Sequence, residues 1–156
     1  MNDKELNDIL SIYLADVIES LEKNNSSYRI IKRNSDEWNT INKWVIDNFP
    51  FKSFGLIKWS EVANSKCYEW WDWEEMCAAL SNVLMEIKES KDTPVYLIWS
   101  DDSFPFFEVN YESILSSGDV IIDADSDAWI VCPSKGWCIE KHHDNEICFG
   151  YIKNRQ

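Results

Sequence analysis

The most regular pattern of apolar residues along the chain lies in its middle, after a tryptophan-rich stretch. From Trp73 to Ile87, apolar residues recur every three or four positions for four turns. That period predicts a helix with one buried face, and Trp73 is the first residue of that face. Asp72 followed three residues later by Glu75 resembles a capping box, and both acids suit the positive end of a helix dipole. We therefore predict a central helix over residues 72–89.

Amphipathic stripes with the same period occur twice before this central helix, and Ser35 is placed to cap the second of them. A short apolar run between the two stripes is typical of a strand. The pattern is weaker from residue 51 to residue 69. The elements expected in this half are helices over residues 3–22 and 36–48, strands over residues 28–31 and 54–59, and a helical turn over residues 60–62.

After the central helix, the apolar runs become short and rich in β-branched and aromatic residues, as in strands. Asn110 is placed to cap a short helix that Gly118 would end. Turn residues separate the last three runs, which predicts an antiparallel meander. The expected elements are strands over residues 95–99, 106–109, 127–132, 137–141 and 146–152 and a helix over residues 111–115. The predicted fold is α+β, with N-terminal helices and one long central helix packed on a mostly antiparallel sheet that ends in the meander.

Length and composition favour one globular domain over residues 1–156. The chain is 45% apolar and has 22 aromatic residues, enough for a core without added cross-links. No run approaches the ~18 apolar residues of a membrane span, and the N-terminus lacks a signal-peptide pattern. Five cysteines without CxxC spacing are interpreted as buried thiols. We expect a cytoplasmic protein with no membrane contact.

Charge is distributed unevenly along the chain. The formal net charge is −13; residues 61–134 carry sixteen acids and three bases, while residues 1–60 and 135–156 are close to neutral. Between Asp101 and Ser134 there are eight acids and no lysine or arginine. Such a field repels nucleic acid and anionic membranes, and it attracts a cationic partner. The alternative is an acidic surface that serves solubility alone.

Three aspartates have the spacing of the first calcium ligands of an EF-hand, Asp123-x-Asp125-x-Asp127. The other requirements are missing, because Ala128 stands where the loop needs glycine and Ser134 where it needs glutamate. On a strand, the three carboxylates would share one face. We therefore favour an acidic ridge over a calcium site.

The C-terminal region contains the residue types of a zinc site, but their spacing matches no zinc finger and the cysteines have apolar neighbours. A triad of Cys138, His142 and Asp144 has no glycine-rich elbow to support it. The four glycines stand too far apart to form a phosphate loop. We predict no catalytic residue, no metal and no cofactor. The zinc candidates considered are Cys132, Cys138, Cys148, His142 and His143.

What remains is acid interleaved with aromatic residues. Trp70 and Trp71 fall outside the stripe of the central helix, so we expect at least one of them near the surface. The alternative is that both cover the sheet from a loop. Exposed tryptophan ringed by carboxylates is the composition of a binding face for a basic protein. The residues predicted to form that face are Trp70, Trp71, Asp101, Asp102, Asp123, Asp125 and Asp127.

A small, acidic, tryptophan-rich α+β protein without a catalytic motif resembles bacterial immunity proteins of polymorphic-toxin and contact-dependent growth inhibition (CdiI-like) systems. The resemblance lies in the second half of the chain, in residues 95–101, 127–131, 137–143 and 147–150. It implies a one-to-one complex with a cognate toxin domain, often a basic nuclease, encoded directly upstream. It names a broad class, and no binding residues are carried over from it.

The resemblance implies a binding protein rather than an enzyme, and two other interpretations remain. One is a small metal-binding regulator or enzyme that uses the acids or the C-terminal Cys/His group. The other is an acidic mimic of nucleic acid that inhibits a DNA-binding protein. We expect no direct contact with nucleic acid, because the acidic field repels it.

Overall fold

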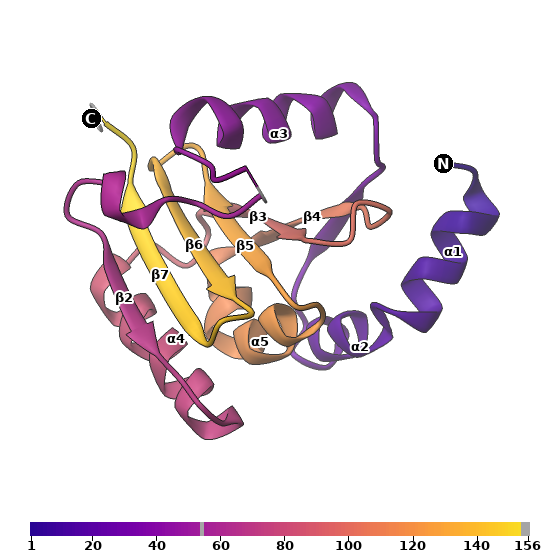
Figure 1. Ribbon diagram of the computed structural model, residues 1–156. Coiled ribbons are helices and arrows are strands. Elements are labelled where there is room, and N and C mark those ends of the chain that lie inside the picture. Colours follow the sequence, from indigo (N-terminus) through magenta and orange to yellow (C-terminus); the bar gives the residue numbers. More distant parts are fainter. Residues whose placement is uncertain (54, 154–156) are drawn as a thin grey trace.

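The computed structural model of the protein describes residues 1–53 and 55–153. Within them, seven strands form one antiparallel sheet in the order β1-β4-β3-β5-β6-β7-β2 (Figure 1). The last three strands in the chain are neighbours in the sheet, which confirms the predicted meander. The strands are β1 (Tyr28–Ile31), β2 (Lys66–Glu69), β3 (Pro94–Trp99), β4 (Phe106–Asn110), β5 (Ala128–Cys132), β6 (Trp137–His142) and β7 (Glu146–Tyr151).

Helices cover both faces of the sheet. On one face, helices α2, α4 and α5 bury the larger core, and on the other α3 and residues 56–62 bury a smaller one (Figure 1). This arrangement confirms the predicted α+β class. None of the helices formed by the described residues is long and apolar enough to cross a bilayer. The helices are α1 (Asp3–Ile12), α2 (Ala15–Lys23), α3 (Asp36–Asn48), α4 (Trp73–Ile87), α5 (Tyr111–Asp123) and the 3-10 turn η1 (Trp59–Glu61).

Local capping explains why two helices begin where the sequence predicts. The Ser35 side chain accepts a hydrogen bond from the Trp38 backbone N–H, and Asp72 accepts one from the Glu75 backbone N–H. The buried stripe of α4 begins at Met76, however, because Trp73 is 48% exposed. The expectation that Trp73 belongs to the buried face was therefore wrong.

The single helix predicted over residues 3–22 is two helices. The chain bends at Tyr13 and Leu14, where the Leu14 backbone N–H bonds to the Ile9 carbonyl, five residues back, at 3.2 Å. The bend buries Leu14 completely and places the Tyr13 ring 5.8 Å from that of Phe104. The apolar period continues through the bend, so the sequence pattern does not reveal it.

The helix predicted over residues 111–115 runs on to Asp123 as α5. Gly118 does not end it but lets it approach α4, since a Cβ there would lie 2.8 Å from Leu80 Cδ2. Asp123 therefore ends a helix, while Asp125 and Asp127 follow in the loop before β5. The sequence predicted that the three aspartates share one face of a strand. That prediction was wrong, because none of them lies in a strand.

The segment between α3 and α4 differs most from expectation. Phe54, the first residue of the strand predicted over residues 54–59, lies outside the described residues. In place of the predicted strand, the described residues form one isolated β-bridge between Phe51 and Ile57, which is followed by η1. The sequence did not predict β2, an edge strand that pairs with β7.

Strand β2 also corrects the interpretation of the cysteines. Cys67 stands directly opposite Cys148 of β7, with Cα atoms 4.0 Å apart, and the two form a disulfide. The prediction of five buried thiols was wrong for this pair. Cys132 and Cys138 are buried thiols as predicted, and Cys77 is half-buried.

Candidate functional site

Strand direction brings the predicted acidic residues to one end of the sheet. β3 and β6 end there, β5 begins there, and β2 ends there before it leads into α4. The connection from α5 to β5, the β6–β7 turn and the β2–α4 connection lie on the lower side of Figure 1. We call this region the acidic end and define it by Asp101, Asp102, Asp123, Asp125 and Asp127.

Hydrogen bonds hold two loops of the acidic end together. Asp125 Oδ2 accepts from the Asp101 backbone N–H at 2.7 Å and from Ser100 Oγ at 2.8 Å. A second hydrogen bond joins the same two loops, because the Asp127 backbone N–H donates to Ser100 Oγ at 3.4 Å. Asp125 is therefore engaged with its own chain, whereas Asp101, Asp102 and Asp123 are exposed to solvent.

Asp127 also joins the acidic end to the β6–β7 turn. Its Oδ1 accepts from the His143 backbone N–H at 2.8 Å and lies 2.8 Å from His143 Nδ1. The hydrogen bond to Asp127 raises the pKa of His143 above its usual range, because the carboxylate favours the protonated ring. Asp144, on the same turn, adds a further negative charge beside His143.

Lys141 is the cation buried beneath these acids. Its Nζ donates to the Asp125 carbonyl oxygen at 2.8 Å and lies 5.8 Å from the centre of the Trp70 ring. Burial lowers the pKa of Lys141, and the charges of Asp123, Asp127 and Asp125 oppose that effect. Lys141 is buried, whereas Asp101, Asp102 and Asp123 are exposed, so the solvent-facing surface of the acidic end is negative.

The two tryptophans of the predicted face separate. Trp71 is 74% exposed, which confirms that at least one of them lies at the surface. Trp70 is half-buried and packs against the larger core, while its backbone N–H donates to the Asn145 carbonyl at 2.9 Å. Trp70 thus supports the end of the sheet, and Trp71 is the one free to contact a partner.

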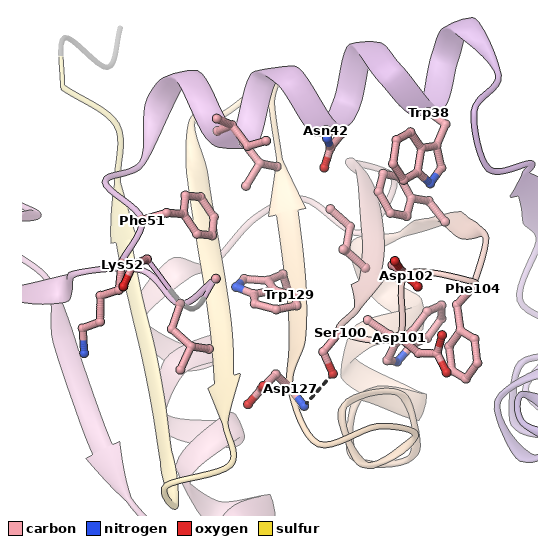
Figure 2. A pocket seen from close by; sticks show the side chains of 18 residues that line it. Trp38, Asn42, Phe51, Lys52, Ser100, Asp101, Asp102, Phe104, Asp127 and Trp129 are labelled. Carbon is pink, nitrogen blue, oxygen red and sulfur yellow. Dashed lines mark hydrogen bonds between the residues drawn. The ribbon is translucent and has the colours of Figure 1, made fainter.

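A groove of about 510 Å³ opens beside the acidic end, between α3 and the sheet (Figure 2). We call it the α3 groove. Asp101, Asp102 and Asp127 lie at one end of it, and Lys52 lies on the opposite side. Its apolar walls come from Trp38, Phe51, Leu56, Ile98, Phe106 and Trp129.

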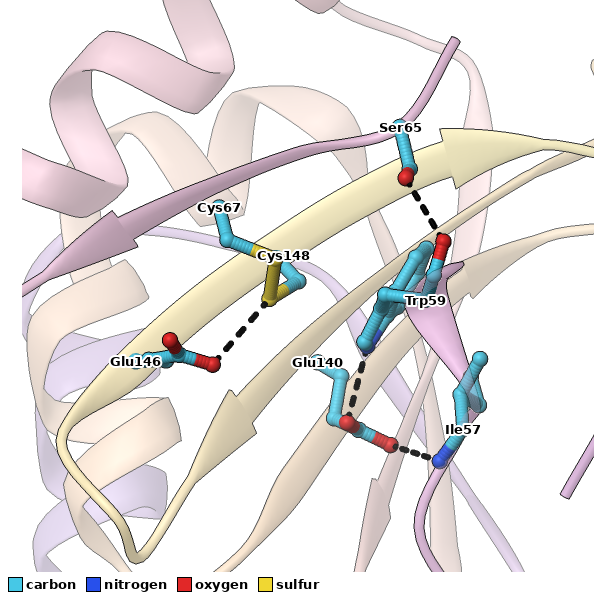
Figure 3. The surroundings of a disulfide bond; sticks show 7 residues. All are labelled: Ile57, Trp59, Ser65, Cys67, Glu140, Glu146 and Cys148. Atoms are coloured by element: carbon cyan, nitrogen blue, oxygen red, sulfur yellow. Dashed lines mark hydrogen bonds between the residues drawn. A yellow bond between two sulfur atoms is a disulfide. The ribbon is translucent and has the colours of Figure 1, made fainter. Parts of the chain in front are cut away.

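A buried carboxylate fixes one wall of this groove. Glu140 of β6 is fully buried, and its Oε2 accepts from Trp129 Nε1 at 2.7 Å and from the Ile57 backbone N–H at 2.9 Å. Oε1 accepts from Trp59 Nε1 at 2.9 Å (Figure 3). Burial raises the pKa of Glu140 above its usual range, and the three donors oppose the rise. Glu140 thereby ties the sheet to the segment that borders the groove.

The structure places the candidate metal ligands in different parts of the molecule. Cys148 is in the disulfide and Cys138 is in the smaller core, so the Cys/His group considered as a zinc site does not assemble around either residue. Asp127 does approach both histidines: ligand atoms of Asp127, His142 and His143 lie within 4.8 Å of one another. In this structure Asp127 and His143 bond to each other.

Sequence reasoning missed the α3 groove. Its walls come from elements far apart in the chain, and Trp38 and Trp129 read as ordinary core positions of a helix and a strand. Glu140 carries little signal, because it follows three apolar residues of a predicted strand but precedes Lys141, as an exposed acid could. An acid at such a position is buried only when donors surround it, which the sequence does not show.

Comparison with known protein families finds one that the chain resembles over most of its length. The family model for CdiI immunity proteins, EcoliA0-like, matches residues 13–150. A comparison with curated proteins finds no match. The matched range includes the acidic end, the α3 groove and the Glu140 cluster.

Proposed function

The chain belongs to the CdiI immunity protein family, EcoliA0-like, and from that premise we propose that it neutralises its cognate toxin by binding a basic, nuclease-type toxin domain at the acidic end. Members of this class act by binding a toxin, so we assign the protein no reaction of its own. The observation that supports the proposal is the convergence of Asp101, Asp102 and Asp123 at a solvent-facing end of the sheet.

Electrostatics explains why such a surface suits a nuclease. An active site that holds phosphates is basic, and a negative surface on the partner speeds encounter and favours the correct orientation. The only arginine near this surface in the described residues, Arg33, lies 3.8 Å from Asp102, whose side chain is 90% exposed. Within the described part of the chain, the other cations beside the acidic end are Lys141, which is buried, and His143, which bonds to Asp127, so the charge exposed to solvent there is mainly negative.

Trp71 supplies the apolar contact that charge alone does not. Tryptophan is enriched among the residues that dominate binding free energy, and Trp71 protrudes next to the N-terminus of α4. Docked over a basic cleft, the acidic end would fill the space that the nucleic acid needs. Neutralisation then follows from occupancy of the cleft.

The direct test is a co-purification with the product of the gene immediately upstream, at low and at high salt. We expect a one-to-one complex that weakens as salt rises and that abolishes the toxic activity. Absence of a complex at any salt concentration, together with full toxicity in cells that produce both proteins, would overturn the proposal. A protein that instead competes with DNA for an unrelated DNA-binding protein would point to nucleic-acid mimicry.

A further inference from the structure

We propose that the α3 groove receives an arginine side chain from a loop of the toxin domain. The groove then recognises one residue specifically, while the acidic end attracts and orients the toxin domain electrostatically. This inference rests on the proposed function and adds a specific contact to it. It is carried by three features of the groove: its aromatic walls, its one-sided charge and its rigidity.

The walls and the charge suit a guanidinium group. Trp38, Phe51 and Trp129 present flat aromatic surfaces, and Asp101 and Asp102 lie at one end of the same groove (Figure 2). A guanidinium is planar, stacks on aromatic rings and forms two parallel hydrogen bonds to a carboxylate. The ammonium of lysine is compact and more strongly hydrated, so it exploits fewer of these contacts.

The walls are held in place before any partner arrives. Trp38 stacks on Phe106 with ring centres 4.9 Å apart, and Trp129 is fixed by its hydrogen bond to Glu140. Little ordering is then needed on binding, which improves affinity. The smaller core beneath the groove packs the same side chains from behind.

The first test fills the groove without changing charge. Asn42 lines the groove from α3, so Asn42→Trp places a large side chain in it; Asn39→Trp makes the same change at an exposed position of α3 outside the groove. We expect Asn42→Trp to weaken toxin binding by about tenfold or more, mainly through faster dissociation, as for loss of a central contact. Asn39→Trp should bind like the wild type, and thermal melts should show both variants folded.

The second test identifies the residue that enters. Each arginine of the toxin domain is replaced in turn by lysine and by glutamate, and binding is measured against the wild type and against Asp102→Lys. At one arginine position of the toxin, replacement by lysine should weaken binding to the wild-type immunity protein. The glutamate variant at that position should bind the Asp102→Lys immunity protein more tightly than it binds the wild type. Asp92→Lys, at the opposite end of β3, is the matched control and should show no such preference.

The outcomes separate the inference from the function on which it rests. Binding of Asn42→Trp within twofold of the wild type, with no arginine sensitive to lysine replacement, overturns the inference and leaves the immunity function standing. Sensitivity of a toxin lysine rather than an arginine also overturns it. Failure of the wild-type protein to bind the toxin at all overturns the proposed function itself.

Discussion

At the scale of single residues, Glu140 shows how a buried charge is accommodated without a cation. Three N–H groups, from Ile57, Trp59 and Trp129, surround its two oxygens at 2.7 to 2.9 Å. A carboxylate can accept on both oxygens, whereas an amide has one acceptor and would turn its own N–H groups toward a donor. The carboxylate is thus matched to this site by the number of its acceptors.

Glu140→Gln is therefore expected to lower the free energy of unfolding by about 1–3 kcal/mol, the cost of a buried donor left unpaired. Urea denaturation of the two proteins measures the difference, with the exposed Glu19→Gln as control. Equal stability of Glu140→Gln and the wild type would show that the three hydrogen bonds add nothing net.

The raised pKa of Glu140 adds a dependence on pH. The folded state holds the proton more tightly than the unfolded state, so this group stabilises the fold more as pH falls from neutral through the raised pKa toward 4.5. The stability difference between the wild type and Glu140→Gln should consequently be larger at pH 5 than at pH 7. A difference that shrinks at pH 5 would contradict the assignment.

His143 shifts in the same sense for a different reason, because Asp127 stabilises its protonated ring. The stabilisation is fully present below pH 6.5 and is lost as pH rises through the raised pKa. An NMR titration should place the His143 pKa above 6.5 and should return it toward that value in Asp127→Asn. A His143 pKa at or below 6.5 in the wild type would rule out the bond to Asp127 in solution.

At the scale of elements, the sequence predicts best where capping and period agree. Ser35 and Asp72 mark the starts of α3 and α4, and turn residues mark the meander. It fails where tertiary contacts decide, as at Leu14, whose burial bends a continuous stripe, and at Gly118, whose missing Cβ serves packing rather than a helix end. Strand β2 is an exposed edge strand, so its sequence lacks the apolar alternation by which a strand is predicted.

Strand β2 pairs on one side only, so we expect its attachment to the sheet to depend on its disulfide. The bridge joins residues 81 apart in sequence, so its loss should lower stability by about 2–4 kcal/mol under oxidising conditions. Cys67→Ser should show this loss and then be insensitive to dithiothreitol. Cys77→Ser, which removes a half-buried free thiol, should keep the wild-type sensitivity. A dithiothreitol-sensitive Cys67→Ser would assign the effect to another pair.

At the scale of the whole molecule, the candidate site was predicted in part. Charge density along the sequence identified the acidic segment, and the fold brings its aspartates to one end of the sheet. The sequence could not show that Trp71 is exposed while Trp70 is half-buried, nor that Lys141 is buried beneath the acids. The α3 groove depends on the packing of α3 against β3 and β5, which no local pattern encodes.

We propose that the acidic end binds the toxin, and the salt dependence of the association rate tests this most directly. Asp101, Asp102 and Asp123 are exposed and are each reversed to lysine in one variant; Glu61, Asp92 and Glu112, exposed at the opposite end, are reversed in the control. We expect the first variant to associate about ten to a hundred times more slowly at low salt, with a flattened salt dependence, and the control to stay close to the wild type. Equal rates and equal salt dependence in both variants would place the interface elsewhere and contradict the account.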